Sequence, residues 1–219
     1  MKKYLATFLV GLLIGSTIIF LLYSGGETPS LPNASDQLLD EILSEWTSVP
    51  DTSQSTTAFL FHLNGARIGT VPDTVRALAR RVQSLYLVPE GVVIAQWILE
   101  SKWGLADLGA NNYFGHTYAA TKKYYAHPRF VLKQDKQYVS GTALLVHVRF
   151  ARYSSVAECF EVHGKYLSGS AYYRDAFKQN SAERFARSLA SHYAADPDYA
   201  LKLITIMKRY QLQKATWPQ

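Results

Sequence analysis

The chain of 219 residues contains a single cysteine, Cys159, which excludes an intramolecular disulfide. Cys159 stands in the apolar stretch SVAECFEVH, which favours a buried, inert thiol over a reactive one. The six histidines are scattered, with no HExxH motif and no pair of cysteine ligands, so no metal site and no cofactor are predicted. No glycine-rich phosphate loop, internal repeat, low-complexity tract or coiled-coil heptad is found in the sequence.

Charge is also sparse at the N-terminus. Lys2 and Lys3 precede an uncharged run from Tyr4 to Ser24, long enough to cross a hydrocarbon core of ~30 Å as a helix. No small-x-small cleavage site follows, which favours an uncleaved anchor over a cleaved signal peptide, although the second reading stays open. The two lysines place the N-terminus in the cytoplasm and the rest of the chain outside. A single-pass protein of the cell membrane, with its domain on the periplasmic or wall side, is therefore predicted.

The remainder of the chain divides by composition. Residues 1–24 form the predicted anchor, and residues 25–70 a linker with a stalk or packing helix over 36–46. Residues 71–212 are dense in apolar and aromatic side chains and form the predicted compact domain, followed by a tail at 213–219. Pro72 and Asp73 signal the start of its first helix.

One carboxylate, Glu100, lies in the apolar run WILESKWG, on a predicted helix that begins near Pro89 and stops near Gly104. Helical spacing places Trp97 and Trp103 on its face. Partial burial raises the pKa of a carboxyl group, and a protonated carboxyl can act as a general acid. The helix alone leaves an ordinary surface glutamate equally open.

Short motifs follow one another along residues 72–210. They are Ala95-Gln96, Leu99-Glu100-Ser101, Trp103-Gly104, Asn111-Asn112, Phe114-Gly115, Tyr153-Ser154-Ser155, Tyr193-Ala194-Ala195-Asp196-Pro197, Tyr199-Ala200 and Lys202-Leu203. In this order the motifs resemble the bacterial endo-β-N-acetylglucosaminidase family of peptidoglycan hydrolases, which includes autolysins and the wall-cutting domain of the flagellar rod protein.

The resemblance implies an α+β fold, mostly helical and lysozyme-like, with a small β-hairpin lobe. The residues support this, because alternating side chains over 137–150 indicate a hairpin with its turn near Ser140 and Gly141. Helices are expected over 156–168 and 182–194. Asp196 and Pro197 are typical of the start of a last helix, whose stripe of Tyr199, Leu203, Ile206 and Tyr210 is expected to lie in the core.

The resemblance also implies roles for single residues. Glu100 becomes the general acid that protonates the leaving oxygen, and Tyr193 a cleft tyrosine that holds the sugar or orients the reacting centre. Packing under the domain stays open for Tyr193. Trp103 and Phe114 are expected to line the cleft. Asn112 is a substrate-binding candidate, although shaping the turn is the better reading of the asparagine pair.

The chain departs from the family in the β lobe. Relatives often carry a glutamate in the pattern T-x-E-Y-x-x-G, whereas DKQYVSG places Gln137 at that position. Gln137 can hold water or substrate but cannot take a proton. Asp135 lies two residues earlier, on the same face of a regular strand, and is the first substitute. Glu158 and Glu161 are later candidates, and the substrate's acetamido group could also act as the nucleophile.

The predicted function is cleavage of the β-1,4 bond after N-acetylglucosamine in peptidoglycan glycan strands. Two alternatives stay open: a catalytically weak wall-binding or scaffold protein on the same fold, and a cut that forms a 1,6-anhydro end, as lytic transglycosylases make. The Gly-Leu-Met-Gln block of that last class is absent. The basic, aromatic segment TKKYYAHPR is assigned to wall polymer or solvent rather than nucleic acid, and an envelope protein partner is left open.

Overall fold

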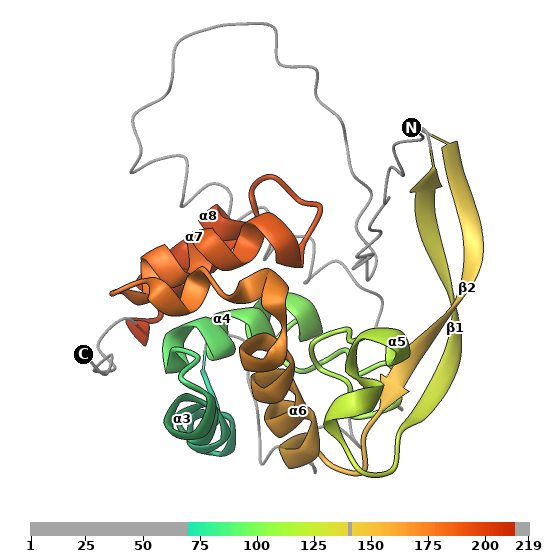
Figure 1. Ribbon diagram of the computed structural model, residues 1–219, viewed down its shortest axis with the longest axis horizontal. Coiled ribbons are helices and arrows are strands. Elements are labelled where there is room, and N and C mark those ends of the chain that lie inside the picture. Colours follow the sequence, from blue (N-terminus) through green and yellow to red (C-terminus); the bar gives the residue numbers. More distant parts are fainter. Residues whose placement is uncertain (1–69, 140–141, 213–219) are drawn as a thin grey trace, which may run out of the picture.

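The computed structural model describes residues 70–139 and 142–212 (Figure 1). The predicted anchor at 1–24, almost all of the linker and stalk region at 25–70, the Ser140-Gly141 turn and the tail at 213–219 lie outside the described residues. Within them, no helix has the length and apolar character that a bilayer crossing needs.

The described elements are mostly helices, with two strands in the middle of the chain. In order they are α3 (Asp73–Tyr86), α4 (Glu90–Ser101), α5 (Tyr118–Thr121), η1 (Lys122–Tyr124), β1 (Arg129–Val139), β2 (Thr142–Arg152), α6 (Val156–Gly169), η2 (Ala171–Tyr173), η3 (Ala176–Lys178), α7 (Ala182–Tyr193) and α8 (Tyr199–Arg209). The mostly helical α+β architecture with a small hairpin agrees with the prediction.

Helix α4 is the centre of the helical body, and α3, α7 and α8 pack against it (Figure 1). Eleven of its twelve residues are buried. Its sequence is apolar on nearly every face, and such a helix is stable only when neighbours cover it on all sides. The buried polar side chains that remain on α4, among them Gln96 and Glu100, therefore need partners inside the domain.

Local sequence signals explain where most helices begin. Pro72 precedes α3, and Ser155 caps α6 by accepting a hydrogen bond from the Glu158 amide at 3.1 Å. The helices expected over 156–168 and 182–194 match α6 and α7 to within one residue.

The predicted start of the last helix is wrong by two residues. The backbone forms a turn at Pro197 and Asp198, and α8 begins at Tyr199. Asp196 stabilises this turn instead of capping the helix. Its Oδ1 accepts from the Asp198 amide at 2.9 Å, and its Oδ2 pairs with Lys202 at 2.7 Å.

The hairpin stands beside the helical body (Figure 1). Its eleven-residue strands pair antiparallel, from Arg129 opposite Arg152 to Val139 opposite Thr142. The base of β2 is tied to the loop before α5, because the Ala151 amide donates to the His116 carbonyl at 2.9 Å and Phe150 bridges Thr117. The hairpin prediction is confirmed for the strands.

The core lies between α3, α4, α6, α7 and α8 and is rich in aromatic rings. Cys159 on α6 belongs to it and is fully buried, as the sequence predicted. Burial raises the pKa of its thiol far above the ordinary range, so the group stays protonated and unreactive.

Candidate active site around Glu100

The motif Glu100-Ser101-Lys102-Trp103-Gly104 builds a sharp end to α4. The helix stops at Ser101, and the next three residues are left-handed, with φ of 51°, 61° and 80°. Ser101 stabilises this turn: its hydroxyl donates to the Trp97 carbonyl at 2.5 Å and accepts from the Gly104 amide at 2.7 Å. Only glycine adopts such a conformation without steric cost, which accounts for Gly104. The turn fixes Glu100 in the last helical turn.

Glu100 is 8% exposed. Its Oε1 accepts a hydrogen bond of 2.6 Å from the Tyr199 hydroxyl, across from α8. Burial raises the pKa of the Glu100 carboxyl to about 8, the Tyr199 hydrogen bond opposes that rise, and the negative charge of Asp196 adds to it. A carboxyl group with this pKa is mostly protonated at neutral pH and can donate a proton.

Tyr193 ends α7 beside the same group. Its ring stacks on Tyr199 with centroids 5.4 Å apart, and it is 2% exposed. Burial, and then the nearby Glu100 charge, raise the pKa of its phenol well above the ordinary value. Within the described residues its hydroxyl has no hydrogen-bond partner. A buried phenol without a partner, next to the acid, is available to bind a group that enters the site.

Trp103 and Phe114, which the resemblance assigned to the cleft, are both buried. Trp103 is 1% exposed and packs edge-on against Trp97 and Tyr210, with ring centroids 6.2 and 4.8 Å away. Phe114 is fully buried and stacks on the His163 ring at 3.8 Å. Both side chains pack in the core of this structure, and their expected role in lining the cleft stays a prediction.

Asn112 is fully buried and satisfied by the backbone. Its side-chain Nδ2 donates to the backbone carbonyls of His116 and Ala151, both at 2.9 Å, and its Oδ1 accepts from the backbone amide of His116 at 2.9 Å. These three bonds hold the loop before α5 against the base of β2. Asn112 thus shapes the turn and is not free to bind substrate, in line with the better of its two sequence readings.

Asp135 and Gln137 both lie in β1, opposite Val146 and Leu144. Their side chains are outside what the structure describes. Asp135 is four residues beyond Val131, whose partner Phe150 marks the anchored base of the hairpin, so it lies ~13 Å further along the strand. The role of either residue stays a prediction.

The two later acidic candidates are engaged on α6. Glu158 accepts from the amide and hydroxyl of Ser154 at 2.6 and 2.7 Å, at the start of the helix. Glu161 pairs with Lys165 at 2.8 Å, one turn along the same helix. Both carboxylates therefore have structural roles at or near the surface of α6.

Four buried polar residues of this region were missed or read as packing: Gln96, His116, His163 and Tyr199. Tyr199 was assigned to the core stripe of the last helix, and it does lie in the core, but its hydroxyl contacts the acid. Gln96 precedes Glu100 by one helical turn in an apolar helix, which is the signal that could have identified it.

One hollow of the described structure lies apart from this site. This hollow of about 500 Å³ between α3 and the start of α6 is lined by residues such as Thr74, Leu78 and Ser155, and Glu100 is not among them. Over residues 70–139 and 142–212, no group of three or more histidine, cysteine or acidic side chains is arranged to hold a metal ion.

The sequence that builds this site matches a known protein family. The family model described as mannosyl-glycoprotein endo-beta-N-acetylglucosaminidase matches residues 76–212, more than half of the chain. The exo-glucosaminidase LytG of Bacillus subtilis is 29% identical over 150 residues, which are 65% of this chain and 51% of that protein. The autolysin of Enterococcus faecalis is 32% identical over 136 residues, which are 58% of this chain and 18% of that protein. The chain spans about half or less of these curated relatives.

Solved structures share the fold. The catalytic domain of the autolysin Auto from Listeria monocytogenes superposes with a TM-score of 0.56 at 24% identity, over 86% of this chain and 99% of that one. A peptidoglycan hydrolase mutant from Sphingomonas sp. A1 gives a TM-score of 0.53 at 22% identity, over 71% of this chain and 96% of that one. The lysozyme-like fold with a small two-stranded sheet is thereby confirmed.

Proposed function

Because the chain belongs to the mannosyl-glycoprotein endo-beta-N-acetylglucosaminidase family, we propose that it is a peptidoglycan hydrolase of the glucosaminidase type, with Glu100 as the general acid. The reaction is hydrolysis of the β-1,4 bond that follows N-acetylglucosamine in the glycan strand. The names of the relatives, an exo-glucosaminidase and an autolysin among them, support this substrate class.

The observation that carries the proposal is the buried Glu100 carboxyl and its 2.6 Å hydrogen bond from Tyr199. A sugar oxygen is a poor leaving group until it is protonated, so the enzyme needs an acid that keeps its proton at working pH. A pKa of about 8 provides that proton at pH 7, and Tyr199 fixes the orientation of the carboxyl group as it loses the proton.

Most glycoside hydrolases use a second carboxyl group in addition to the general acid. In this proposal Asp135 takes that role, because Gln137 occupies the usual position of the glutamate and cannot ionise. The distance of Asp135 along the hairpin requires the lobe to approach the helical body when substrate binds. A single-acid route, in which the acetamido group of the sugar acts as nucleophile, is the alternative mechanism.

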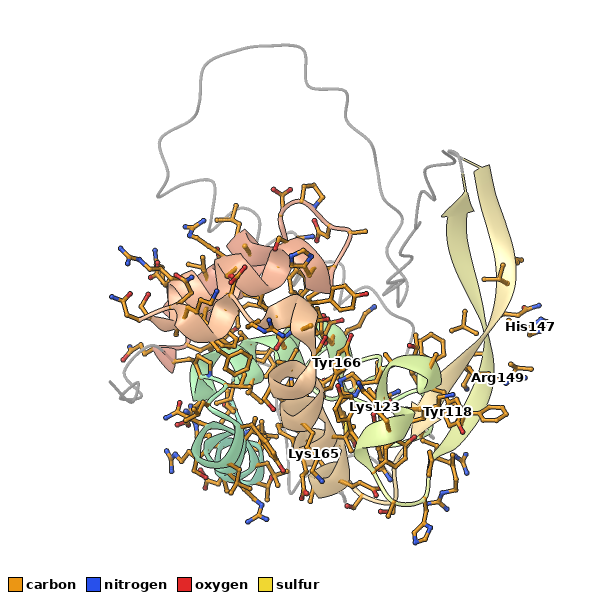
Figure 2. The ribbon with its side chains drawn as sticks, in the orientation of Figure 1. Tyr118, Lys123, His147, Arg149, Lys165 and Tyr166 are labelled. Carbon is orange, nitrogen blue, oxygen red and sulfur yellow. The ribbon has the colours of Figure 1, made fainter. Side chains whose placement is uncertain are left out.

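The positive charge of the hairpin lobe also suits it to bind peptidoglycan. Residues 117–152 contain seven lysines and arginines and one aspartate, so this segment alone accounts for the formal net charge of +6. Arg149 lies over the Phe130 ring at 5.0 Å, and Tyr118 packs on the same ring at 5.3 Å. Figure 2 shows His147 and Arg149 pointing from β2 away from the helical body. Peptide stems of peptidoglycan carry carboxylates, which such a surface attracts.

The proposal places the domain outside the cell membrane, held by the uncharged run from Tyr4 to Ser24. Full-length chain is then expected in membrane fractions, and protease added outside should digest it once any outer barrier is opened. Soluble protein that begins after Ser24 would replace the anchor with a cleaved signal peptide.

The decisive experiment is digestion of purified peptidoglycan with the full chain, with products identified by mass spectrometry. New reducing ends of N-acetylglucosamine are the expected result. Reducing ends of N-acetylmuramic acid would assign the other β-1,4 bond, and 1,6-anhydro ends would assign a transglycosylase-type cut. Binding to the wall without any product would identify the chain as the catalytically weak wall-binding or scaffold protein.

A further inference from the structure

A continuous chain of hydrogen bonds runs through the core from the acid to the base of the hairpin. The side chains in it come from α4, α6, α8 and the segments on either side of the hairpin. Its five bonds are Glu100–Tyr199 at 2.6 Å, Tyr199–Gln96 at 3.1 Å, Gln96–His163 at 3.1 Å, His163–His116 at 3.0 Å and His116–Tyr153 at 2.8 Å.

The donors and acceptors in this series of hydrogen bonds are fixed, because each side chain has a limited number of protons to donate. Tyr199 has one hydroxyl proton and gives it to Glu100, so it accepts from the Gln96 amide nitrogen. The Gln96 oxygen then faces His163 and accepts from its Nε2–H. The His163 Nδ1 is left without a proton and accepts from the Nε2–H of His116. His163 is therefore a neutral Nε2–H tautomer, and His116 also holds a proton on its Nε2.

The surroundings hold the two rings in place. His163 is fully buried and lies parallel to Phe114, with 4° between the ring planes. His116 is 3% exposed, and its Nδ1 lies 2.8 Å from the Tyr153 hydroxyl. Tyr153 has one proton, and it goes to this nitrogen rather than to the Thr121 hydroxyl, which is 3.4 Å away. Burial lowers the pKa of both imidazoles, His163 having the additional effect of the nearby His116, so neither takes up a second proton near neutral pH. Both histidine rings therefore stay neutral near pH 7, and the direction of the hydrogen bonds between them is fixed.

We propose that Gln96, His163 and His116 are positioning residues that hold the Tyr199 hydroxyl as the hydrogen-bond donor to Glu100. The role of Glu100 as the acid rests on the proposed function, but the chain of donors does not. Without His163, the Gln96 oxygen loses its donor and the amide is free to turn. It then offers its oxygen to Tyr199 and competes with Glu100 for the hydroxyl proton.

The effect of losing the Tyr199 hydrogen bond on the pKa of Glu100 depends on the groups that face this carboxyl group. They are Tyr193 on α7, Tyr199 on α8 and Asp196 in the loop between these helices, with Lys202 paired to Asp196. Of these, only Tyr199 donates a hydrogen bond to the carboxyl group in the described structure, and this bond lowers the pKa of Glu100. Loss of the donor should raise the pKa by about one pH unit.

The test is a carbon-13 NMR titration of Glu100 in the full chain purified in detergent, together with nitrogen-15 NMR of the histidine rings. Glu100→Gln assigns the carboxyl signal. Tyr199→Phe and His163→Phe should each raise the pKa of Glu100 by about one pH unit, and the double variant should raise it no further than the larger single shift. Tyr173→Phe also removes a buried hydroxyl, one bonded to Tyr166, and should leave the titration unchanged.

Two results would overturn the proposal. One is a shift in Tyr199→Phe with none in His163→Phe, which would reduce the histidines to packing. The other is an Nδ1–H tautomer at His116 and His163 in the unsubstituted protein, which reverses the direction of the chain. The tautomer measurement needs no substitution, so it decides even if a variant fails to fold. Neither readout uses activity, so a protein that cuts no peptidoglycan still tests this inference.

Discussion

The Tyr199 hydroxyl and the Glu100 carboxyl are 99 residues apart in the chain and 2.6 Å apart in the fold. One lies at the start of α8 and the other in the last turn of α4. The packing of these two helices gives a buried acid one strong donor and places Tyr193 beside it. The site's electrostatics therefore depend on where two distant helices meet.

The first prediction concerns the acid itself. Glu100→Gln should lower the rate of peptidoglycan cleavage by about 10² to 10⁴, because proton donation typically supplies that factor. Glu90→Gln is the matched control, since Glu90 is also 8% exposed and lies at the opposite end of α4, paired with Arg80. The measurement is release of reducing ends at pH 7, with circular dichroism to verify folding. Full activity in well-folded Glu100→Gln would assign the acid to another residue.

The second prediction concerns pH and rate. Catalysis needs the protonated form of Glu100, whose pKa is about 8, so kcat/KM should be insensitive to this group below that value. Above it, kcat/KM should fall about tenfold per pH unit. The rate is measured on purified wall fragments from pH 6 to about 10 at constant ionic strength. A fall of about tenfold per pH unit already between pH 6 and 7, as an acid with the ordinary glutamate pKa of 4.5 gives, would contradict the assignment.

The third prediction concerns stability. The pKa of Glu100 is about 8 in the folded chain and near 4.5 when unfolded, so between these values the folded state holds the extra proton. The free energy of unfolding should therefore fall as pH rises through this window. Glu100→Gln removes the effect and should stabilise the protein above pH 8, on the order of several kcal/mol at most, with no gain below pH 4.5. Urea unfolding at several pH values provides the measurement.

The fourth prediction concerns acid sensitivity. The pKa of His116 is lowered to about 3 and that of His163 well below 6.5, so below pH 6.5 only the unfolded chain binds these two protons. Their contribution to stability is present above pH 6.5 and is lost as pH falls toward 3. Together with Glu100, which acts in the opposite sense above pH 4.5, they place maximum stability near pH 6.5.

His163→Phe isolates this effect while keeping a ring to stack on Phe114. Between pH 4.5 and 6.5 the unfolded chain has a net excess of one proton, which gives a slope of about 1.4 kcal/mol per pH unit. The variant removes that proton, so its slope should be close to zero there. The same slope in both proteins would mean that His163 titrates alike in the folded and unfolded states.

The fifth prediction concerns the β lobe. Asp135→Asn should lower cleavage strongly and Gln137→Ala only mildly, because Asp135 alone of the pair can carry a charge. Gln137→Glu restores a carboxylate at the family position and is expected to raise the rate. Each is measured by reducing-end release, with equal wall binding as the control. If Asp135→Asn is harmless and Gln137→Ala abolishes cleavage, the amide positions a water or the acetamido group and the single-acid mechanism holds.

Local patterns were sufficient for the elements that depend on neighbours in the chain. Alternation predicted the hairpin, Pro72 and Asp73 predicted the start of α3, and the helices expected over 156–168 and 182–194 match α6 and α7 to within one residue. The start of α8 was missed because Asp196 bonds to the backbone of its own turn, a competition that the residue types alone do not resolve.

The sequence by itself determined most helices and the hairpin, because periodicity and short motifs act over a few residues, and its resemblance to a known family implied the fold class and one acid. Only the tertiary structure decided the surroundings of that acid. Trp103 and Phe114 pack inward, while Tyr199 and Gln96, which local pattern places among apolar neighbours, meet Glu100 and His163. The physical reason is that a buried polar group is satisfied by whichever partner packing brings within about 3 Å, and that partner comes from any part of the chain.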